Sequence, residues 1–344
     1  SGAFAFAFSS PSIANVRLPA SNPTLGGATI TLEGANFGAV KTKLNIKVGS
    51  TACLAGFVGH TSVSCVIAAG VGKQLDVSIT VDALAGTLAS SYFYDPPTVT
   101  SVSPGTGPTS GGFAVIIRGT NFGAPALSSS RTAEIGGFAC ASNSDSWTDS
   151  SVTCNVSANT GTSKPVFIKI QADGNVNRDQ SVTAASMFSY SVPTVASFAP
   201  ANCPTAASQT LVINGTNFGS DASKVNVFVG STKCTVVAVG SNHDTISCNI
   251  AAGSGAGYSI NVAVDGQSAD KVSKTFNYDA PSLTAIEPRI GSTAGAFTMT
   301  VFGKNFGIAS ADALVSFIPL SRSGQGNSGL SVVRIADSSV TFVV

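Results

Sequence analysis

Short stretches of the chain alternate apolar and polar residues, and glycine or proline lies between the stretches. In one of them Phe113, Val115 and Ile117 fall on one face, while Ala114 and Arg118 fall on the other. Alternation with a period of two, bounded by turn-forming residues, predicts β-strands. Since no helical period of comparable strength occurs, the sequence predicts an all-β chain. The same alternation is found at residues 44–48, 77–81, 225–229 and 260–264.

A tripeptide, Asn-Phe-Gly, divides the chain into four similar copies. A motif that returns at steps of 85, 96 and 88 residues (from 36 to 121, 217 and 305) indicates one small domain copied in tandem. Several short strands within about 90 residues are typical of an antiparallel β-sandwich. The four occurrences are Asn36-Phe37-Gly38, Asn121-Phe122-Gly123, Asn217-Phe218-Gly219 and Asn305-Phe306-Gly307.

The motif itself has a mechanical explanation. Glycine adopts backbone angles that other residues avoid, and asparagine tolerates the left-handed region. The phenylalanine between them can then fold inward and close one end of the sandwich. Because a buried aromatic ring usually belongs to the core, we interpret Asn-Phe-Gly as a structural turn rather than a ligand site.

The copies resemble a known family. Each opens with a proline and a short apolar stretch, then has a small-residue turn, Gly-x-Asn-Phe-Gly and, in two copies, Ser-Val-x-Cys. This pattern is similar to the IPT/TIG domains, immunoglobulin-like sandwiches found in plexin and Met-type receptors, fibrocystin-like surface proteins and Rel-type transcription factors. The resemblance covers nearly the whole chain and implies the fold. It leaves the function open, because function depends on surfaces that vary within a fold.

The copies define the expected domains. Residues 11–96, 97–192 and 193–280 are predicted to be three complete IPT/TIG domains, and 281–344 a fourth that is incomplete. Phe4, Phe6 and Phe8 match the alternating aromatic residues that end the complete copies, so residues 1–10 are predicted to be the last strand of a preceding domain. We expect the chain to be a segment of a longer array. The alternative is that neighbouring molecules complete the fourth domain.

Cysteines recur in step with the domains. Three pairs lie 12, 14 and 14 residues apart, which indicates one disulfide in each of three domains; two reduced core cysteines per domain are the alternative. The fourth copy has Phe342 in place of the second cysteine, so apolar packing is expected there. The seventh cysteine, Cys203, is either unpaired or bonded to another chain or to a cysteine elsewhere. The pairs are Cys53 with Cys65, Cys140 with Cys154, and Cys234 with Cys248.

Charged residues are few. They make up 10% of the chain, the net charge is +1 and the mean hydropathy is +0.32. A surface rich in serine, threonine, alanine and glycine is suited to packing against neighbouring proteins or to being covered by sugar. Asn155 and Asn214 lie in N-glycosylation sequons. With 18 basic and 17 acidic residues the positive face that nucleic acid binding needs is missing. No apolar run is long enough to span a membrane.

Catalytic and metal-binding chemistry is poorly supported. The chain has two histidines, His60 and His243, each five residues before a cysteine, where Asp149 stands in the second copy. They occupy a repeated turn, and no Ser-His-Asp set can be assembled within one domain. There is no Cys-x-x-Cys pair for zinc. We expect neither enzyme activity, nor a cofactor, nor a metal.

Two classes of function remain. The first is a non-enzymatic extracellular scaffold, a segment of an array that builds a filament, coat or flagellar-hair-like assembly at the cell surface. Its partners would be copies of itself or co-assembling surface proteins. The alternative is the ectodomain of a receptor or adhesin that binds one partner. Low charge and the odd cysteine favour the scaffold.

Overall fold

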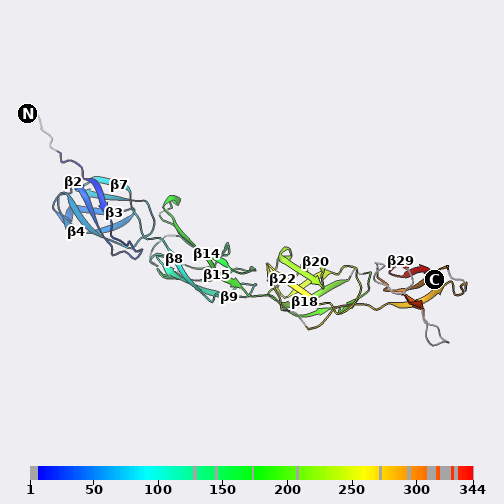
Figure 1. The fold of residues 1–344 in the computed structure, drawn as a ribbon. Helices are drawn as coiled ribbons and strands as arrows, with labels where there is room; N and C mark the ends of the chain where they lie inside the picture. Colours follow the sequence, from blue (N-terminus) through cyan, green and yellow to red (C-terminus); the bar gives the residue numbers. More distant parts are fainter. Residues whose placement is uncertain are drawn as a thin grey trace, which may run out of the picture. The chain divides into compact units, whose positions relative to one another are not determined.

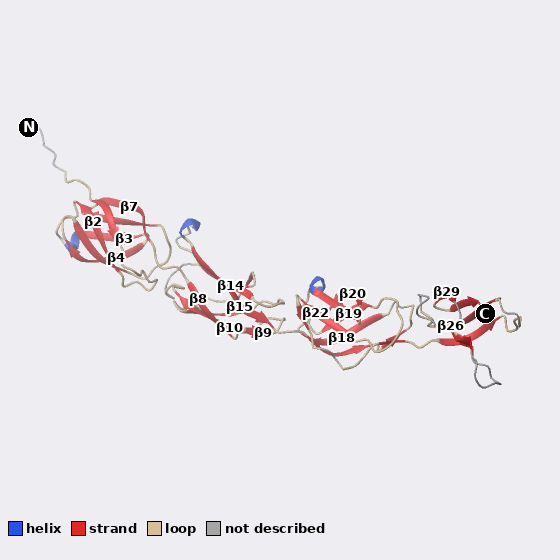
Figure 2. Cartoon of the chain, viewed as in Figure 1, coloured by secondary structure: helices blue, strands red, loops and turns tan. Residues whose placement is uncertain are grey.

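A computed structural model shows a chain built almost entirely of β-strands (Figure 2). The structure describes residues 7–125, 127, 130–143, 146–172, 174–206, 209–270, 273–292, 296–307, 315–317, 327–328 and 332–343. No α-helix occurs among these residues. The predicted all-β class is therefore confirmed. Single 3-10 turns include η1 (Lys41–Lys43), η3 (Val176–Arg178) and η4 (Ala222–Lys224).

The chain packs as two compact units. Unit 1 comprises Ser1–Gly107, Gly111–Ala158 and Thr162–Ser189, and unit 2 comprises Pro108–Ser110, Asn159–Gly161 and Tyr190–Val344. The two short loops of unit 2 thus belong, in sequence, to the second repeat. The four repeats are numbered domains 1 to 4 and comprise residues 11–96, 97–192, 193–280 and 281–344.

Domain 1 is one seven-stranded antiparallel sheet that curls around a core, with the strand order β1-β2-β5-β4-β3-β6-β7 (Figure 1). Alternate residues of β6, namely Leu75, Val77 and Ile79, are buried, as the period of two requires. Tyr92 and Tyr94 complete this core. The strands are β1 (Ser12–Arg17), β2 (Thr29–Ala35), β3 (Leu44–Val48), β4 (Thr51–Val58), β5 (Ser62–Ile67), β6 (Leu75–Val81) and β7 (Leu84–Tyr92).

Domain 2 has two separate sheets, ordered β13-β10-β8 and β12-β11-β14-β15-β9. Apolar residues of both sheets, among them Val115, Ile117 and Ile168, are fully buried, so the core lies between two layers. The strands are β8 (Thr98–Ser103), β9 (Thr106–Gly107), β10 (Ala114–Thr120), β11 (Arg131–Ile135), β12 (Phe138–Ala139), β13 (Ser151–Asn155), β14 (Lys164–Ile170) and β15 (Gln180–Tyr190).

Domain 3 repeats the strand order of domain 1 as β16-β18-β21-β20-β19-β22-β23, with a short parallel pair, β17 and β24. Its core contains Phe218, Ile246 and Phe276. The strands are β16 (Thr194–Ala199), β17 (Asn202–Cys203), β18 (Thr210–Thr216), β19 (Val225–Val229), β20 (Thr232–Val239), β21 (Thr245–Asn249), β22 (Ile260–Val264), β23 (Gln267–Ser268) and β24 (Asn277–Tyr278).

Domain 4 has a four-stranded sheet, β25-β26-β30-β29, and a two-stranded pair, β27-β28. Phe342, which stands where a cysteine was expected, is fully buried and lies opposite Met299 in the sheet. Phe4 and Phe6 of the expected preceding strand lie outside the described residues, and Phe8 is exposed. The strands are β25 (Ser282–Glu287), β26 (Thr298–Lys304), β27 (Ser316–Phe317), β28 (Asn327–Ser328), β29 (Val332–Ala336) and β30 (Ser339–Val343).

Candidate functional site

The Asn-Phe-Gly motif has the same backbone in all four domains. The asparagine φ angles are 64°, 59°, 60° and 60° for Asn36, Asn121, Asn217 and Asn305, and each glycine that follows also has a positive φ. Asparagine is among the few residues that adopt this left-handed region without large strain. The motif is therefore a fixed turn at the end of one strand in each copy.

The phenylalanine of the turn closes the core. Phe37, Phe122 and Phe218 are fully buried, and Phe306 is 7% exposed. Its backbone N–H donates to the carbonyl of the residue that lies five positions before the second cysteine or its equivalent. The four N···O distances are 3.0 Å to His60, 2.9 Å to Asp149, 2.9 Å to His243 and 3.1 Å to Asp337.

The asparagine side chain holds the linker that precedes its own domain. The Nδ2 group donates to the carbonyl of the residue just before the opening proline in every copy. This hydrogen bond joins the turn to the residue that precedes the first strand, so it fixes where the chain enters the domain. The acceptors are Ser10 for Asn36 (3.1 Å), Pro96 for Asn121 (3.2 Å), Val192 for Asn217 (3.1 Å) and Ala280 for Asn305 (3.3 Å).

A threonine from the preceding domain contacts this turn. In unit 1 the Thr24 hydroxyl donates to Asp149 Oδ1, which also accepts from the Gly123 N–H at 3.1 Å. In unit 2 Thr205 donates to Asp337 Oδ1. Each threonine follows the same early turn in its own domain, so the contacts form one interdomain junction that is repeated along the chain.

Within unit 2, the loop Pro108–Ser110 meets the turn of domain 3 at an imidazole instead of a carboxylate. Thr109 Oγ1 lies 3.0 Å from His243 Nδ1, and the Thr109 N–H donates to Asn217 Oδ1 at 3.3 Å. His243 is buried, with 7% of its surface exposed, and has a φ of 63°. Burial lowers the pKa of the His243 ring, and the carboxylate of Asp244 partly opposes this shift.

Two equivalent glutamines add a second contact to two of the junctions. In unit 1 Gln180 Nε2 donates to the Tyr94 carbonyl at 2.6 Å, while its Oε1 accepts from the Gly72 N–H at 3.1 Å. In unit 2 Gln267 Nε2 donates to the Tyr190 carbonyl at 3.1 Å. Burial raises the pKa of both tyrosines to about 12. In both cases the tyrosine ring is buried, while the backbone carbonyl of the same residue accepts a hydrogen bond from the glutamine.

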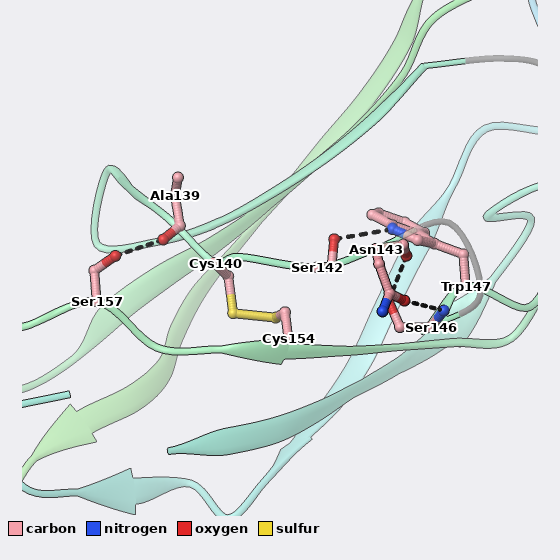
Figure 3. The surroundings of a disulfide bond; sticks show 8 residues. All are labelled: Ala139, Cys140, Ser142, Asn143, Ser146, Trp147, Cys154 and Ser157. Carbon is pink, nitrogen blue, oxygen red and sulfur yellow. Dashed lines mark hydrogen bonds between the residues drawn. A yellow bond between two sulfur atoms is a disulfide. The ribbon is translucent and has the colours of Figure 1, made fainter. Parts of the chain in front are cut away.

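The three cysteine pairs are joined in the structure. The Sγ atoms are 2.07 Å apart in Cys53–Cys65 and in Cys140–Cys154, and 2.15 Å apart in Cys234–Cys248. Figure 3 shows the second pair, near which Trp147 donates from Nε1 to Ser142 Oγ at 3.1 Å. Cys203 is unpaired and 1% exposed, in the core of domain 3.

We expect non-reducing peptide mapping of the native chain to find these three pairs. Cys203 should resist alkylation until the chain is denatured, because its thiol is buried and burial, with the charge of Asp279, raises the pKa of the thiol. Ready alkylation of the six paired cysteines, or a Cys203 bond to another chain, would contradict this expectation.

Both sequon asparagines are accessible. Asn155 ends β13 and Asn214 lies in β18, and the side chains of both are exposed. In β18 Leu211 and Ile213 are buried, and the alternation of the strand turns Asn214 outward. Glycosylation of either residue stays a prediction.

Sequence reasoning missed an apolar patch on domain 1. Leu54 and Phe57 on β4 are 72% and 66% exposed, and Val66, the cross-strand neighbour of Leu54 on β5, is 40% exposed. The pairing of β4 with β5 shifts register between Ala55 and Val58, so a simple period of two does not predict the exposure of Phe57. We call Leu54, Phe57 and Val66 the domain 1 patch.

Within the described ranges no group of three or more His, Cys, Asp or Glu residues could hold a metal ion. Among the same residues no helix is long and apolar enough to cross a membrane.

The repeated sandwiches and their turns define the class of protein. Residues 11–94, 97–190 and 193–278 match the IPT/TIG domain, and the chain belongs to this family. The chain is 28% identical to human (Homo sapiens) Fibrocystin-L over 306 residues, 87% of this chain but 7% of that protein. It is 25% identical to mouse (Mus musculus) Plexin-B2 over 278 residues, 80% of this chain and 14% of that protein. A solved Plexin A4 extracellular region is 18% identical, covers 97% of this chain and 29% of that one, and has a TM-score of 0.26.

Proposed function

We propose that the chain is a non-enzymatic segment of an extracellular scaffold, in which the turn of an IPT/TIG domain binds a threonine loop that precedes it in the chain. The observation that carries the proposal is the junction that recurs three times, with a threonine of one domain bonded to Asp149, His243 or Asp337 of the following domain. A chain that served only as a flexible tether would not need side chains committed to every junction.

Cysteine use supports the extracellular location. Disulfides persist in oxidising compartments and are rare in the cytosol, and three domains of this chain each contain one in the structure. The exposed asparagines Asn155 and Asn214 fit the same compartment, since N-linked glycans are added to secreted chains.

The surface supports assembly along the array. Only 10% of the residues are charged, whereas about 25% of the residues of a typical soluble domain are charged. Burying apolar surface gains roughly 25 cal/mol per Å², so weak contacts repeated on linked domains add up. The expected partners are copies of this chain, co-assembling surface proteins and glycans.

A concentration series in the analytical ultracentrifuge tests the scaffold. We expect purified chains to associate reversibly as concentration rises, since the array presents many weak apolar contacts. Material from the natural source should also carry glycan at Asn155 or Asn214 by intact-peptide mass spectrometry. A chain that stays monomeric, carries no glycan and binds one soluble partner through one domain would contradict the scaffold.

The second candidate is the ectodomain of a receptor or adhesin. The domain 1 patch favours it, because exposed apolar clusters mark interaction sites. In domain 3 Thr235 and Ala238 stand at the matching positions of strand β20, and the other exposed apolar residue of that strand is the smaller Val237. Leu54→Ser with Phe57→Ser would abolish binding of a single partner by a receptor, but would remove only a fraction of the contacts of a scaffold.

A further inference from the structure

One junction differs from the other two in chemistry. The threonine loop of domain 1 and that of domain 3 bond to carboxylates, Asp149 and Asp337. The loop Pro108–Ser110 bonds to an imidazole, His243. Histidine is the side chain whose ordinary charge change falls between pH 5 and 8, whereas ordinary carboxylates are already ionised in that range. The imidazole therefore gives this junction a side chain whose ordinary pKa lies near neutral pH.

The loop buries the His243 ring. Thr109 Oγ1 faces Nδ1 at 3.0 Å, and a second hydrogen bond joins the Thr109 N–H to Asn217 of the same turn. The neighbouring loop Asn159–Gly161 is attached to the Thr109 carbonyl by the Asn159 N–H at 3.0 Å. Release of Thr109 would thus expose the ring to water.

Three charged groups accompany this junction. Asp244 follows His243 in sequence, and among the three groups it is the one whose charge raises the pKa of His243. Lys224 Nζ donates to Asn159 Oδ1 at 3.3 Å, and Asp265 Oδ2 accepts from Thr160 Oγ1 at 3.1 Å. Both of these contacts bind the second loop, Asn159–Gly161.

We propose that the junction at His243 is an acid-sensitive device, in which protonation of the ring releases the loop Pro108–Ser110 from domain 3 while the junctions at Asp149 and Asp337 stay closed. The device would operate in a scaffold and in a receptor alike, because it depends on one contact and on no partner.

The direction follows from linkage. With the loop bound, burial holds the His243 pKa below its usual value; with the loop released, the ring is hydrated and the pKa returns toward about 6.5. The released state therefore binds the proton more readily, so the contact is fully stable above that pH and weakens as the pH falls. If the bound state excluded the proton completely, the equilibrium ratio of released to bound loop would be about 30-fold higher at about pH 5 than at high pH.

Hydrogen exchange of the full chain tests this inference. Peptides that contain Thr109 and Thr160 should lose protection severalfold, and at most about 30-fold, between about pH 7.5 and pH 5, after correction for the intrinsic exchange rate at each pH. The peptide that contains Thr24, from the carboxylate junction of unit 1, should not. The core strand β22 serves as a control for general acid unfolding.

Two matched variants complete the test. His243→Asn keeps a side chain that tolerates a positive φ and does not titrate, so its loop should be protected equally at both pH values. His60→Asn changes the other histidine and should leave the wild-type profile unchanged. NMR titration of the two histidine rings in the wild type needs no variant and should show a depressed His243 pKa. In Thr109→Ala the same titration should show a higher His243 pKa.

The inference is overturned if the Thr109 peptide is equally protected at both pH values in the wild type. It is also overturned if His243→Asn loses protection in acid as the wild type does, because the loss would then come from another group. A Thr109 peptide unprotected even at neutral pH would show that the contact does not hold in solution.

Discussion

Gly119→Ala is expected to destabilise domain 2 by about 3 kcal/mol or more. Gly119 is the first residue of Gly-x-Asn-Phe-Gly, and a Cβ there would lie 1.8 Å from the Thr98 carbonyl oxygen and 2.6 Å from Cζ of Phe122. The first neighbour is backbone of the adjacent strand β8, so the clash cannot be relieved by rotating a side chain. Either the strands separate or the phenylalanine leaves the core.

Trp147 makes this prediction measurable in one domain of the array. It is the only tryptophan of the chain, is buried in domain 2 and lies 6.1 Å from the Phe122 ring between centroids. Its fluorescence during urea denaturation therefore reports the unfolding of domain 2. Gly105→Ala is the matched control, since a Cβ there meets only the Val102 oxygen at 3.7 Å. Equal midpoints for the two variants would refute the expected clash.

Phe218→Ala is expected to cost domain 3 about 3–5 kcal/mol, the range for removing a large aromatic side chain from a core. Phe218 is fully buried and belongs to the core cluster of Ile213, Val227 and Ile246. Removing the ring leaves a cavity at the end of the sandwich, beside the turn that holds both the linker and the Thr109 contact. Stability and attachment should therefore be lost together.

Hydrogen exchange in strands β18 and β21 measures this loss, because these strands pair in the core of the domain. Phe228→Ala is the control in the same domain: the side chain lies on β19 and is 38% exposed. It should change the free energy of unfolding by less than about 1 kcal/mol. A Phe228→Ala effect as large as that of Phe218→Ala would show that the ring of the turn has no special place in the core.

The strands and the core turn could be predicted because their signal is local. Alternation at Val225, Val227 and Val229 places these side chains on one face whatever the rest of the chain does. The conformation of Asn-Phe-Gly likewise follows from the residues of the motif, and both predictions agree with the structure. The family resemblance is confirmed by the match over three of the four copies.

The junctions could not be predicted in the same way. Thr109 and His243 are 134 residues apart, and Thr24 and Asp149 are 125 apart. Within its own repeat, each of these residues lies in a turn. Its second role, as a hydrogen-bond partner in a junction, depends on a residue of another repeat that is distant in sequence. Repetition did hold a clue, since a threonine at 24, 109, 205 and 293 accompanies the turn in every copy. Thr293 lies outside the described residues.

The sequence patterns also did not predict which apolar side chains are exposed and which are buried. Leu54 and Phe57 read as ordinary members of an apolar strand, and only the two faces of the folded sheet distinguish them from Cys53. Cys203 had no partner in sequence, which left an interchain bond open, and the structure places it inside domain 3 instead. Peptide mapping of the native chain decides whether the thiol stays free in solution.

The asparagine that holds the linker also restricts how such a chain can change in evolution. Two residues separate the last tyrosine of a domain from the opening proline of the next in all three cases, from Tyr94 to Pro97, from Tyr190 to Pro193 and from Tyr278 to Pro281. The repeats nevertheless differ in length, so insertions and deletions have accumulated in loops inside the domains. A whole domain can be duplicated or exchanged at these prolines without loss of register, whereas one extra linker residue would move the carbonyl away from its asparagine and the threonine away from its acceptor.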